Sequence, residues 1–315
     1  MNRLAGVNRL AGVNRLAGSG GLGDLLGPTV HVPVLGTLGG RAVMLAVVTV
    51  AALGLAGLAV VVSGSAELRA KWVTWAVIAP AVGLPVWAGR TTTAALAAVI
   101  AVLACLEYGR LMRLHRGDIL LLAVLAVAVP FAALHRPGLL SLTPALVLLA
   151  ALPALVDGDA VRGFERSALS GFGVVWICWS LSALVLLWSD AYLLCFAAAL
   201  ADVGAWCAGK GLRGLRIGDG RPFGRPLSRL SPNKTVGGLL GSLAGASLLL
   251  AAFGELRAGY VLAIALGAVA GDLVESMAKR QAGVKDAGAW LPGFGGLLDR
   301  VDSLLLVLPI AMVLA

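Results

Sequence analysis

Charged residues are scarce in this 315-residue chain. Asp, Glu, Lys and Arg make up 13% of it, whereas 59% is hydrophobic and the mean hydropathy is +0.94. So little charge lies far outside the range of soluble globular proteins. The composition therefore excludes a soluble domain and indicates a protein embedded in a membrane.

Cysteine pairs and alternating strand patterns are also missing. Cys105, Cys178, Cys195 and Cys207 all lie inside apolar runs and form no C-x-x-C pair. A zinc site of paired cysteines and a disulfide framework are thereby excluded. The apolar runs do not alternate with polar residues, which excludes a transmembrane β-barrel.

What the chain does contain is a series of apolar runs near the ~20 residues that a helix needs to cross a bilayer. They predict an all-α polytopic membrane protein with nine to ten transmembrane helices. The count is nine if 72–107 forms one broken span instead of two. The expected spans are 42–62, 72–88, 91–107, 118–134, 139–156, 168–188, 190–209, 236–253, 256–274 and 302–315.

Three regions follow from this pattern. Residues 1–40 are a tail with three NRLAG repeats at a period of six, followed by a loop rich in Gly and Pro. Residues 41–190 hold the N-terminal transmembrane helices. Residues 191–315 form a C-terminal transmembrane region with polar loops at 210–235 and 275–301, where we expect the catalytic site.

The net charge of +9 permits two interpretations. One is nucleic-acid binding; the other is a set of basic cytoplasmic loops, which a membrane protein favours, so we expect no nucleic-acid partner. Loop 210–235 carries one acid and seven bases: Lys210, Arg213, Arg216, Arg221, Arg225, Arg229 and Lys234. Alternation of spans then places 275–301 on the same, cytoplasmic side. The N-terminal bases Arg3, Arg9, Arg15 and Arg41 conflict with ten spans but agree with nine.

The scarce charges concentrate between residues 272 and 302. This segment holds five acids (Asp272, Glu275, Asp286, Asp299 and Asp302) and four bases (Lys279, Arg280, Lys285 and Arg300). Carboxylates packed together repel one another, and a hard cation removes that penalty. Oxygen ligands without nearby His or Cys suit Mg²⁺. Mutual ion pairing of these acids and bases at a membrane surface is the alternative that composition leaves open.

Further residues point to phosphate chemistry at a membrane. The bases of the segment, with Lys234, are the types that hold phosphates. Glycines flank Phe294 in a flexible turn whose amides can approach an anion. Asp202 lies within an apolar run, where an ionisable group is a functional-site hypothesis. Together they fit phosphoryl or nucleotidyl transfer to a lipid.

A longer pattern makes this specific. From Ser276 to Asp302 the chain reads S-x-x-K-R-x4-K-D-x-G-x2-L-P-G-x-G-G-x2-D-R-x-D, and upstream it has SPNKTVGG at 231–238 and DVGAWCAGKGLRG at 202–214. This resembles the phosphatidate cytidylyltransferases, also called CDP-diacylglycerol synthases. The resemblance covers roughly 200–303; before residue 190 only LEYGRL at 106–111 is weakly similar.

The resemblance implies an enzyme of phospholipid biosynthesis. CTP and phosphatidic acid would give CDP-diacylglycerol and pyrophosphate with Mg²⁺, and a second monovalent or divalent cation is an option. It also implies a site that faces the cytoplasm in the bacterial inner membrane, contact with membrane lipids, and a homodimer.

The resemblance also assigns roles to residues of this chain. Expected catalytic residues are Asp272, Asp286, Asp299, Lys285 and Arg300. Expected substrate-binding residues are Ser231, Lys234, Thr235, Ser276, Lys279, Arg280 and Asp202. Expected metal ligands are Asp272, Asp299, Asp302 and Glu275.

Two departures from the family pattern keep alternatives open. Phe294 stands where the family has the His of P-G-H-G-G, and phenylalanine neither moves a proton nor binds metal or phosphate. Val236 and Gly237 replace a common aromatic–acid pair. The alternatives are an enzyme with a different lipid-phosphate acceptor and a non-catalytic paralogue that binds CTP or lipid. A transporter is disfavoured because the acids cluster at one face of the membrane instead of at mid-depth.

Overall fold

The computed structural model describes residues 29–32, 36–217, 221–228, 230–284, 287–288 and 295–314, and these are mostly helical. The N-terminal half comprises strands β1 (Thr29–Val32) and β2 (Gly36–Gly39), then helices α2 (Gly40–Ser63), α3 (Ala66–Ala88), α4 (Arg90–Leu111), α5 (Arg116–His135), η2 (Pro137–Leu142), α6 (Thr143–Leu149) and α7 (Leu152–Val156). The rest comprises α8 (Gly163–Gly173), the π-helix η3 (Val174–Trp179), α9 (Ser180–Leu186), α10 (Trp188–Gly211), β3 (Arg216–Ile217), β4 (Arg221–Pro222), α11 (Val236–Ala252), α12 (Ala258–Ala282), α13 (Leu298–Val301) and α14 (Leu304–Leu314).

The prediction of an all-α membrane protein is confirmed. Every expected apolar segment coincides with a helix or a run of consecutive helices. Among the described residues, seven helical segments are long and apolar enough to cross a bilayer, and α11 is a shorter apolar helix. Large side chains such as Leu55 (71%) and Val62 (81%) are exposed on α2, as the lipid-facing side of a membrane helix requires. The count of nine or ten spans stays a prediction.

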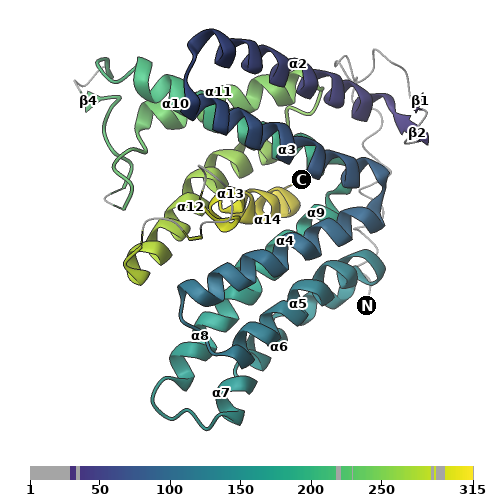
Figure 1. Cartoon of the computed structure of the whole chain (residues 1–315), viewed down its shortest axis with the longest axis vertical. Helices are drawn as coiled ribbons and strands as arrows, with labels where there is room; N and C mark the ends of the chain where they lie inside the picture. Colours follow the sequence, from purple (N-terminus) through teal and green to yellow (C-terminus); the bar gives the residue numbers. More distant parts are fainter. Residues whose placement is uncertain are drawn as a thin grey trace.

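The helices form one bundle with short hairpins at its ends. In Figure 1, α12, α13 and α14 lie at the centre, with α3, α10 and α11 on one side and α4 and α5 on the other. The antiparallel hairpins β1–β2 and β3–β4 lie at opposite ends of the long helices. The first hairpin occupies part of the segment that the sequence predicts as a loop.

Small residues let the central helices approach closely. On α4, Ala94, Ala97, Ala101 and Ala104 lie on one face and are fully buried. Small residues at helix interfaces are typical of membrane bundles, because van der Waals packing replaces the hydrophobic effect there. The same device brings together the helices that carry the expected site.

An ion-pair cluster joins three elements at the end of the bundle where α12 begins. Arg41, at the start of α2, lies 3.0 Å from both Asp190 on α10 and Glu255 before α12. The carboxylate of Asp190 also accepts a hydrogen bond from the hydroxyl of Tyr260 at 2.5 Å. The charge of Arg41 is therefore locally neutralised, which weakens its conflict with a ten-span count.

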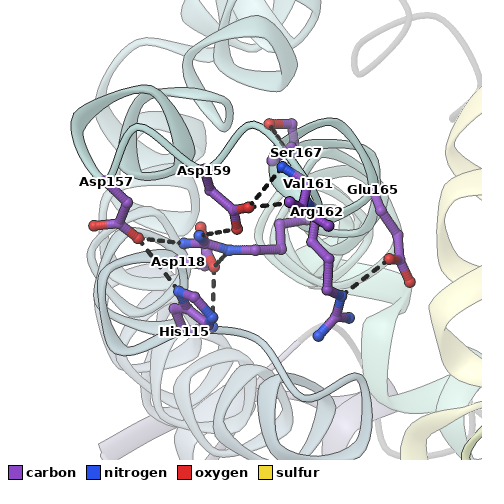
Figure 2. Close-up of polar contacts among 10 residues, drawn as sticks. His115, Asp118, Asp157, Asp159, Val161, Arg162, Glu165 and Ser167 are labelled. Carbon is purple, nitrogen blue, oxygen red and sulfur yellow. Dashed lines mark hydrogen bonds and ion pairs between the residues drawn. The ribbon is translucent and has the colours of Figure 1, made fainter.

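A second ion-pair network surrounds Arg166 (Figure 2). Its guanidinium donates to Asp118, Asp157 and Asp159, each at 2.8 Å, and both Arg166 and Asp118 are fully buried. The backbone N–H of His115 donates to Asp118, and the His115 ring contacts Asp157 at 3.3 Å. Arg166 lies in the first half of α8, just before the expected span 168–188. It ties the start of α5 and the turn after α7 to α8.

Candidate active site

The structure gathers seven of the predicted site residues into two clusters, together with two residues from outside the predicted set, Glu107 and Gly296. The first, which we call the aspartate cluster, contains Asp202, Asp272, Asp302 and Lys234. The second, which we call the glycine-turn cluster, contains Glu107, Glu275, Lys279, Asp299 and Gly296. Both lie where α12 ends and α14 begins, at the opposite end of α12 from Glu255, about 30 Å away by helix rise.

In the aspartate cluster, the three carboxylates come from different elements. Asp272 lies on α12, Asp202 on α10, and Asp302 directly follows α13. Asp302 interacts electrostatically with both other aspartates and with Lys234. Asp202 also interacts electrostatically with Arg300. Three acids, one of them far from the others in the sequence, therefore lie close enough to two bases for their charges to interact.

Gly271 sets the closeness of Asp302 to α12. A Cβ on Gly271 would collide with the backbone carbonyl of Asp302, so only glycine permits this approach. The turn is fixed by the Ser303 N–H, which donates to Oδ1 of Asp302 at 2.7 Å. The residue before Asp272 thus determines where Asp302 lies.

Lys234 is presented by a loop that folds back on itself before α11. The Leu227 N–H donates to the Lys234 carbonyl at 2.7 Å, and the Val236 N–H donates to the Arg225 carbonyl at 3.1 Å. Thr235 caps α11, because its hydroxyl accepts the Gly238 N–H at 3.1 Å. The ammonium of Lys234 lies 3.6 Å from Oδ2 of Asp272. This oxygen is buried and has no hydrogen-bond partner in the described part of the chain.

The glycine-turn cluster is built around Lys279. Its ammonium donates to Glu275 at 2.6 Å and to Asp299 at 2.7 Å, and these carboxylates are only 1% and 6% exposed. The other oxygen of Asp299 accepts the N–H groups of Gly296 at 2.7 Å and Ala287 at 3.0 Å. Burial raises the pKa of Asp299, but hydrogen bonding with Glu275 and Lys279 outweighs it and holds the pKa below its usual range.

Glu107, on α4, is a site residue that the predicted set lacks. It is 3% exposed, and its carboxylate accepts the N–H groups of Leu297 at 2.9 Å and Leu298 at 2.7 Å. A Cβ on Gly288 or Gly296 would come within 2.7 Å of its oxygens, so both glycines are needed for this contact. The only sequence signal was the weakly similar LEYGRL segment.

The remaining predicted residues either lie outside the two clusters or fall outside the residues that the structure describes. Arg280 is exposed in the last turn of α12, where a base also complements the helix dipole. Ser231 and Ser276 are half-buried. Lys285, Asp286 and Phe294 lie outside the described residues.

The donor set suits a hard cation, although no complete cage is present. Within the described ranges, no three acidic, His or Cys side chains are arranged to hold one metal ion. Mg²⁺ is usually held by one or two carboxylates, with substrate phosphates and water completing the shell. Asp272 fits that requirement, because its Oδ2 is buried, accepts no hydrogen bond in the described part of the chain, and has Lys234 near it only at ion-pair distance. Glu275 and Asp299 already direct oxygens at Lys279.

Comparison with known proteins decides the family. The sequence pattern of the cytidylyltransferase family matches residues 69–315. The chain belongs to this family. The match includes α4 and the turn that Glu107 holds, as well as the C-terminal motifs.

Similar members of the cytidylyltransferase family are named phosphatidate cytidylyltransferases. That of Helicobacter pylori strain J99 is 37% identical over 155 residues, which cover 47% of this chain and 53% of the relative. That of Synechocystis is 41% identical over 120 residues, or 35% and 37% of the two chains. That of Brucella abortus strain 2308 is 48% identical over 96 residues, or 27% and 36%. The chain thus matches about half the length of these relatives or less.

Proposed function

We propose that this chain transfers the cytidylyl group of CTP to phosphatidic acid, releasing pyrophosphate. The observation that carries the proposal is the convergence of the aspartate cluster and the glycine-turn cluster at one end of a membrane bundle of the cytidylyltransferase family. The names of the relatives supply the substrates. Membrane helices beside the site suit a lipid acceptor.

In this mechanism, a phosphate oxygen of the lipid attacks the α-phosphorus of CTP. The new P–O bond joins lipid and cytidylyl groups while the bond to the β-phosphate breaks and pyrophosphate leaves. Lys234, Arg280 and Arg300 bind the phosphates of CTP and lipid, because Lys and Arg bind phosphate by charge-assisted hydrogen bonds. No covalent enzyme intermediate is needed.

Mg²⁺ would be held by Asp272. Asp302 and Asp202 interact electrostatically with Asp272 and would add negative charge that attracts the cation. When bound, it neutralises negative charge on the phosphates and on the leaving pyrophosphate. Lys279 and Asp299 fix the turn at Gly296, and Glu107 fixes the adjoining amides of Leu297 and Leu298. Asp299 and Glu275 would bind the metal less readily than Asp272, since Lys279 already pairs with one oxygen of each.

The site would face the cytoplasm in a bacterial inner membrane, since the basic connection between α10 and α11 and the C-terminal end of α12 lie at one end of the bundle. The family resemblance supports a homodimer and an option for a second cation.

The test offers purified protein CTP and a panel of lipid phosphates in detergent, with CDP-lipids identified by mass spectrometry. We expect CDP-diacylglycerol from phosphatidic acid, dependent on Mg²⁺ and lost in Asp272→Asn. If a CDP-lipid forms only from another lipid phosphate, that lipid and not phosphatidic acid is the acceptor. Binding of CTP without any product would instead establish a non-catalytic paralogue and refute the proposed reaction.

A further inference from the structure

An apolar groove of about 430 Å³ lies between η3, α12 and α14. Its walls include Phe172, Trp176 and Trp179 on one side, and Val274, Leu306 and Ile310 on the other. The volume lies within the roughly 300–1,000 Å³ typical of ligand pockets. The groove is open at its rim, where Phe172 is 44% and Val313 is 71% exposed. It belongs to neither of the two polar clusters.

The π-helix shapes one wall of this groove. Segments of this kind are rare, usually a single turn, and often mark functional sites. Here the segment Val174–Trp179 interrupts a long apolar helix between α8 and α9. The Trp176 ring packs between Phe172, at a centroid distance of 5.3 Å, and Tyr108, at 5.9 Å. Tyr108 follows Glu107 on α4, so the wall reaches the level of the glycine turn.

The groove and the proposed site share two helices, α12 and α14. Leu306 lies one helical turn after Asp302, and Val274 lies between Asp272 and Glu275 on α12. From Leu306 to Leu314 the groove follows α14 for about 12 Å, away from the aspartate cluster. The direction is that of a lipid whose phosphate lies at the cluster and whose tail extends into the bilayer.

We propose that this groove binds one acyl chain of the lipid-phosphate substrate. This rests on the proposed function, since it assigns the tail of the lipid whose phosphate reacts. At membrane depth the groove is in contact with acyl chains and not with water, so its apolar lining selects a hydrocarbon occupant.

Photo-crosslinking tests the groove without requiring turnover. The probe is a phosphatidic acid with a diazirine in one acyl chain, present in phosphatidylcholine vesicles that contain the purified full chain. We expect label in peptides covering 172–180 and 304–314, displaced by unlabelled phosphatidic acid but not by added phosphatidylcholine. Label that phosphatidylcholine displaces equally well would show bulk lipid only and overturn the proposal.

Two substitutions occlude the groove. Ile310→Trp fills it from α14, and Val313→Trp narrows its exposed rim without touching buried packing. The matched control is Leu248→Trp, a 71% exposed position on α11 outside the groove. We expect both occluding variants, and not the control, to lose the label. Unchanged label accompanied by loss of a dimer in Ile310→Trp would mean that a second copy occupies the groove, which contradicts the proposal.

Kinetics separate this inference from the proposed function. In Val313→Trp and Ile310→Trp, KM for long-chain phosphatidic acid should rise roughly tenfold, the scale on which apolar pockets discriminate. KM for CTP and for a dihexanoyl acceptor should not change. If the occluding variants turn over with an unchanged ratio of KM for long-chain to KM for dihexanoyl acceptor, the groove assignment is refuted and the proposed reaction stands. If the wild type is labelled in the groove peptides but shows no turnover, the proposed reaction is refuted and the groove assignment stands.

Discussion

The carboxylate of Glu107 accepts the backbone N–H of Leu297 at 2.9 Å across 190 residues of sequence. The contact joins α4, in the N-terminal half, to the glycine turn that adjoins the C-terminal motifs. Lys279 and Asp299 hold the same turn from α12 and α13. The turn is therefore fixed by carboxylates from both halves of the bundle, so the N-terminal helices contribute directly to the geometry of the site.

Replacing Glu107 by Gln should disrupt this turn. A Gln side chain offers one acceptor and one amide donor, so at least one of the two backbone N–H groups would face another donor. We expect the free energy of unfolding to fall by about 2–4 kcal/mol, since hydrogen bonds to charged groups contribute about 1.5–3 kcal/mol each. Thermal unfolding in detergent and CTP-dependent pyrophosphate release should both decline. Glu165→Gln is the control, because Glu165 forms an exposed pair with Arg162. Equal effects of the two substitutions would contradict the role of Glu107.

Lys279→Ala should be more damaging than the loss of an ordinary ion pair. It leaves Asp299 buried without its cation, and an uncompensated buried charge costs about 3–5 kcal/mol. We expect a lower unfolding temperature and no measurable turnover. The double variant Lys279→Met with Asp299→Asn should regain part of the stability but not the activity, because the unpaired charge is gone. Failure of the double variant to regain stability would show that Lys279 acts by packing alone.

The sequence predicted the helical membrane fold and the end of the bundle that holds the acids, because apolar length and charge patterns are local signals. It could not predict how these acids divide. Asp299 and Asp302 are both expected metal ligands, yet α13 ends at Val301 and the two side chains join different clusters. Glu107 and Arg166 were missed as structural residues since only long-range contacts reveal their roles.

The Arg166 network should make the stability of the fold depend on pH in the acidic range. Hydrogen bonding from Arg166 lowers the pKa of Asp157, and hydrogen bonds from the Arg162 backbone and Arg166 lower that of Asp159. A lowered folded-state pKa gives stability that is present above the unfolded value, near ~4, and lost as pH falls through the folded value. The unfolding temperature should therefore drop as the pH falls through about 4 and below.

Asp159→Asn isolates one part of this dependence. Asn keeps an acceptor for the Arg162 N–H but carries no charge for Arg166. The variant should be less stable than the wild type near neutral pH, and the gap should close as the wild-type carboxylate is protonated. Asp118 and His115, which face the same network, remain in both proteins and cancel in the comparison. A gap in unfolding temperature that is constant with pH would refute this account.

Close packing of α10 on α11 should control the position of Asp202. A Cβ on Gly241 would collide with the carbonyl of Gly204 and with Ala208, so the two helices touch through glycine. Gly204 lies two residues after Asp202. Gly241→Leu should force the helices apart, at a cost of about 1–3 kcal/mol or more. It should also weaken Mg²⁺-dependent turnover by moving Asp202 away from Asp272.

The matched control for Gly241→Leu is Gly54→Leu on α2, where a Cβ meets nothing within 4 Å. Leucine is a better helix former than glycine, so Gly54→Leu should unfold at the wild-type temperature or slightly above it. The milder Gly241→Ala should lie between these two, because even one methyl group meets the Gly204 backbone. Unfolding temperatures and the Mg²⁺ concentration for half-maximal turnover test both effects. Equal behaviour of the substitutions at Gly54 and Gly241 would mean that close contact of α10 and α11 does not position the aspartate cluster.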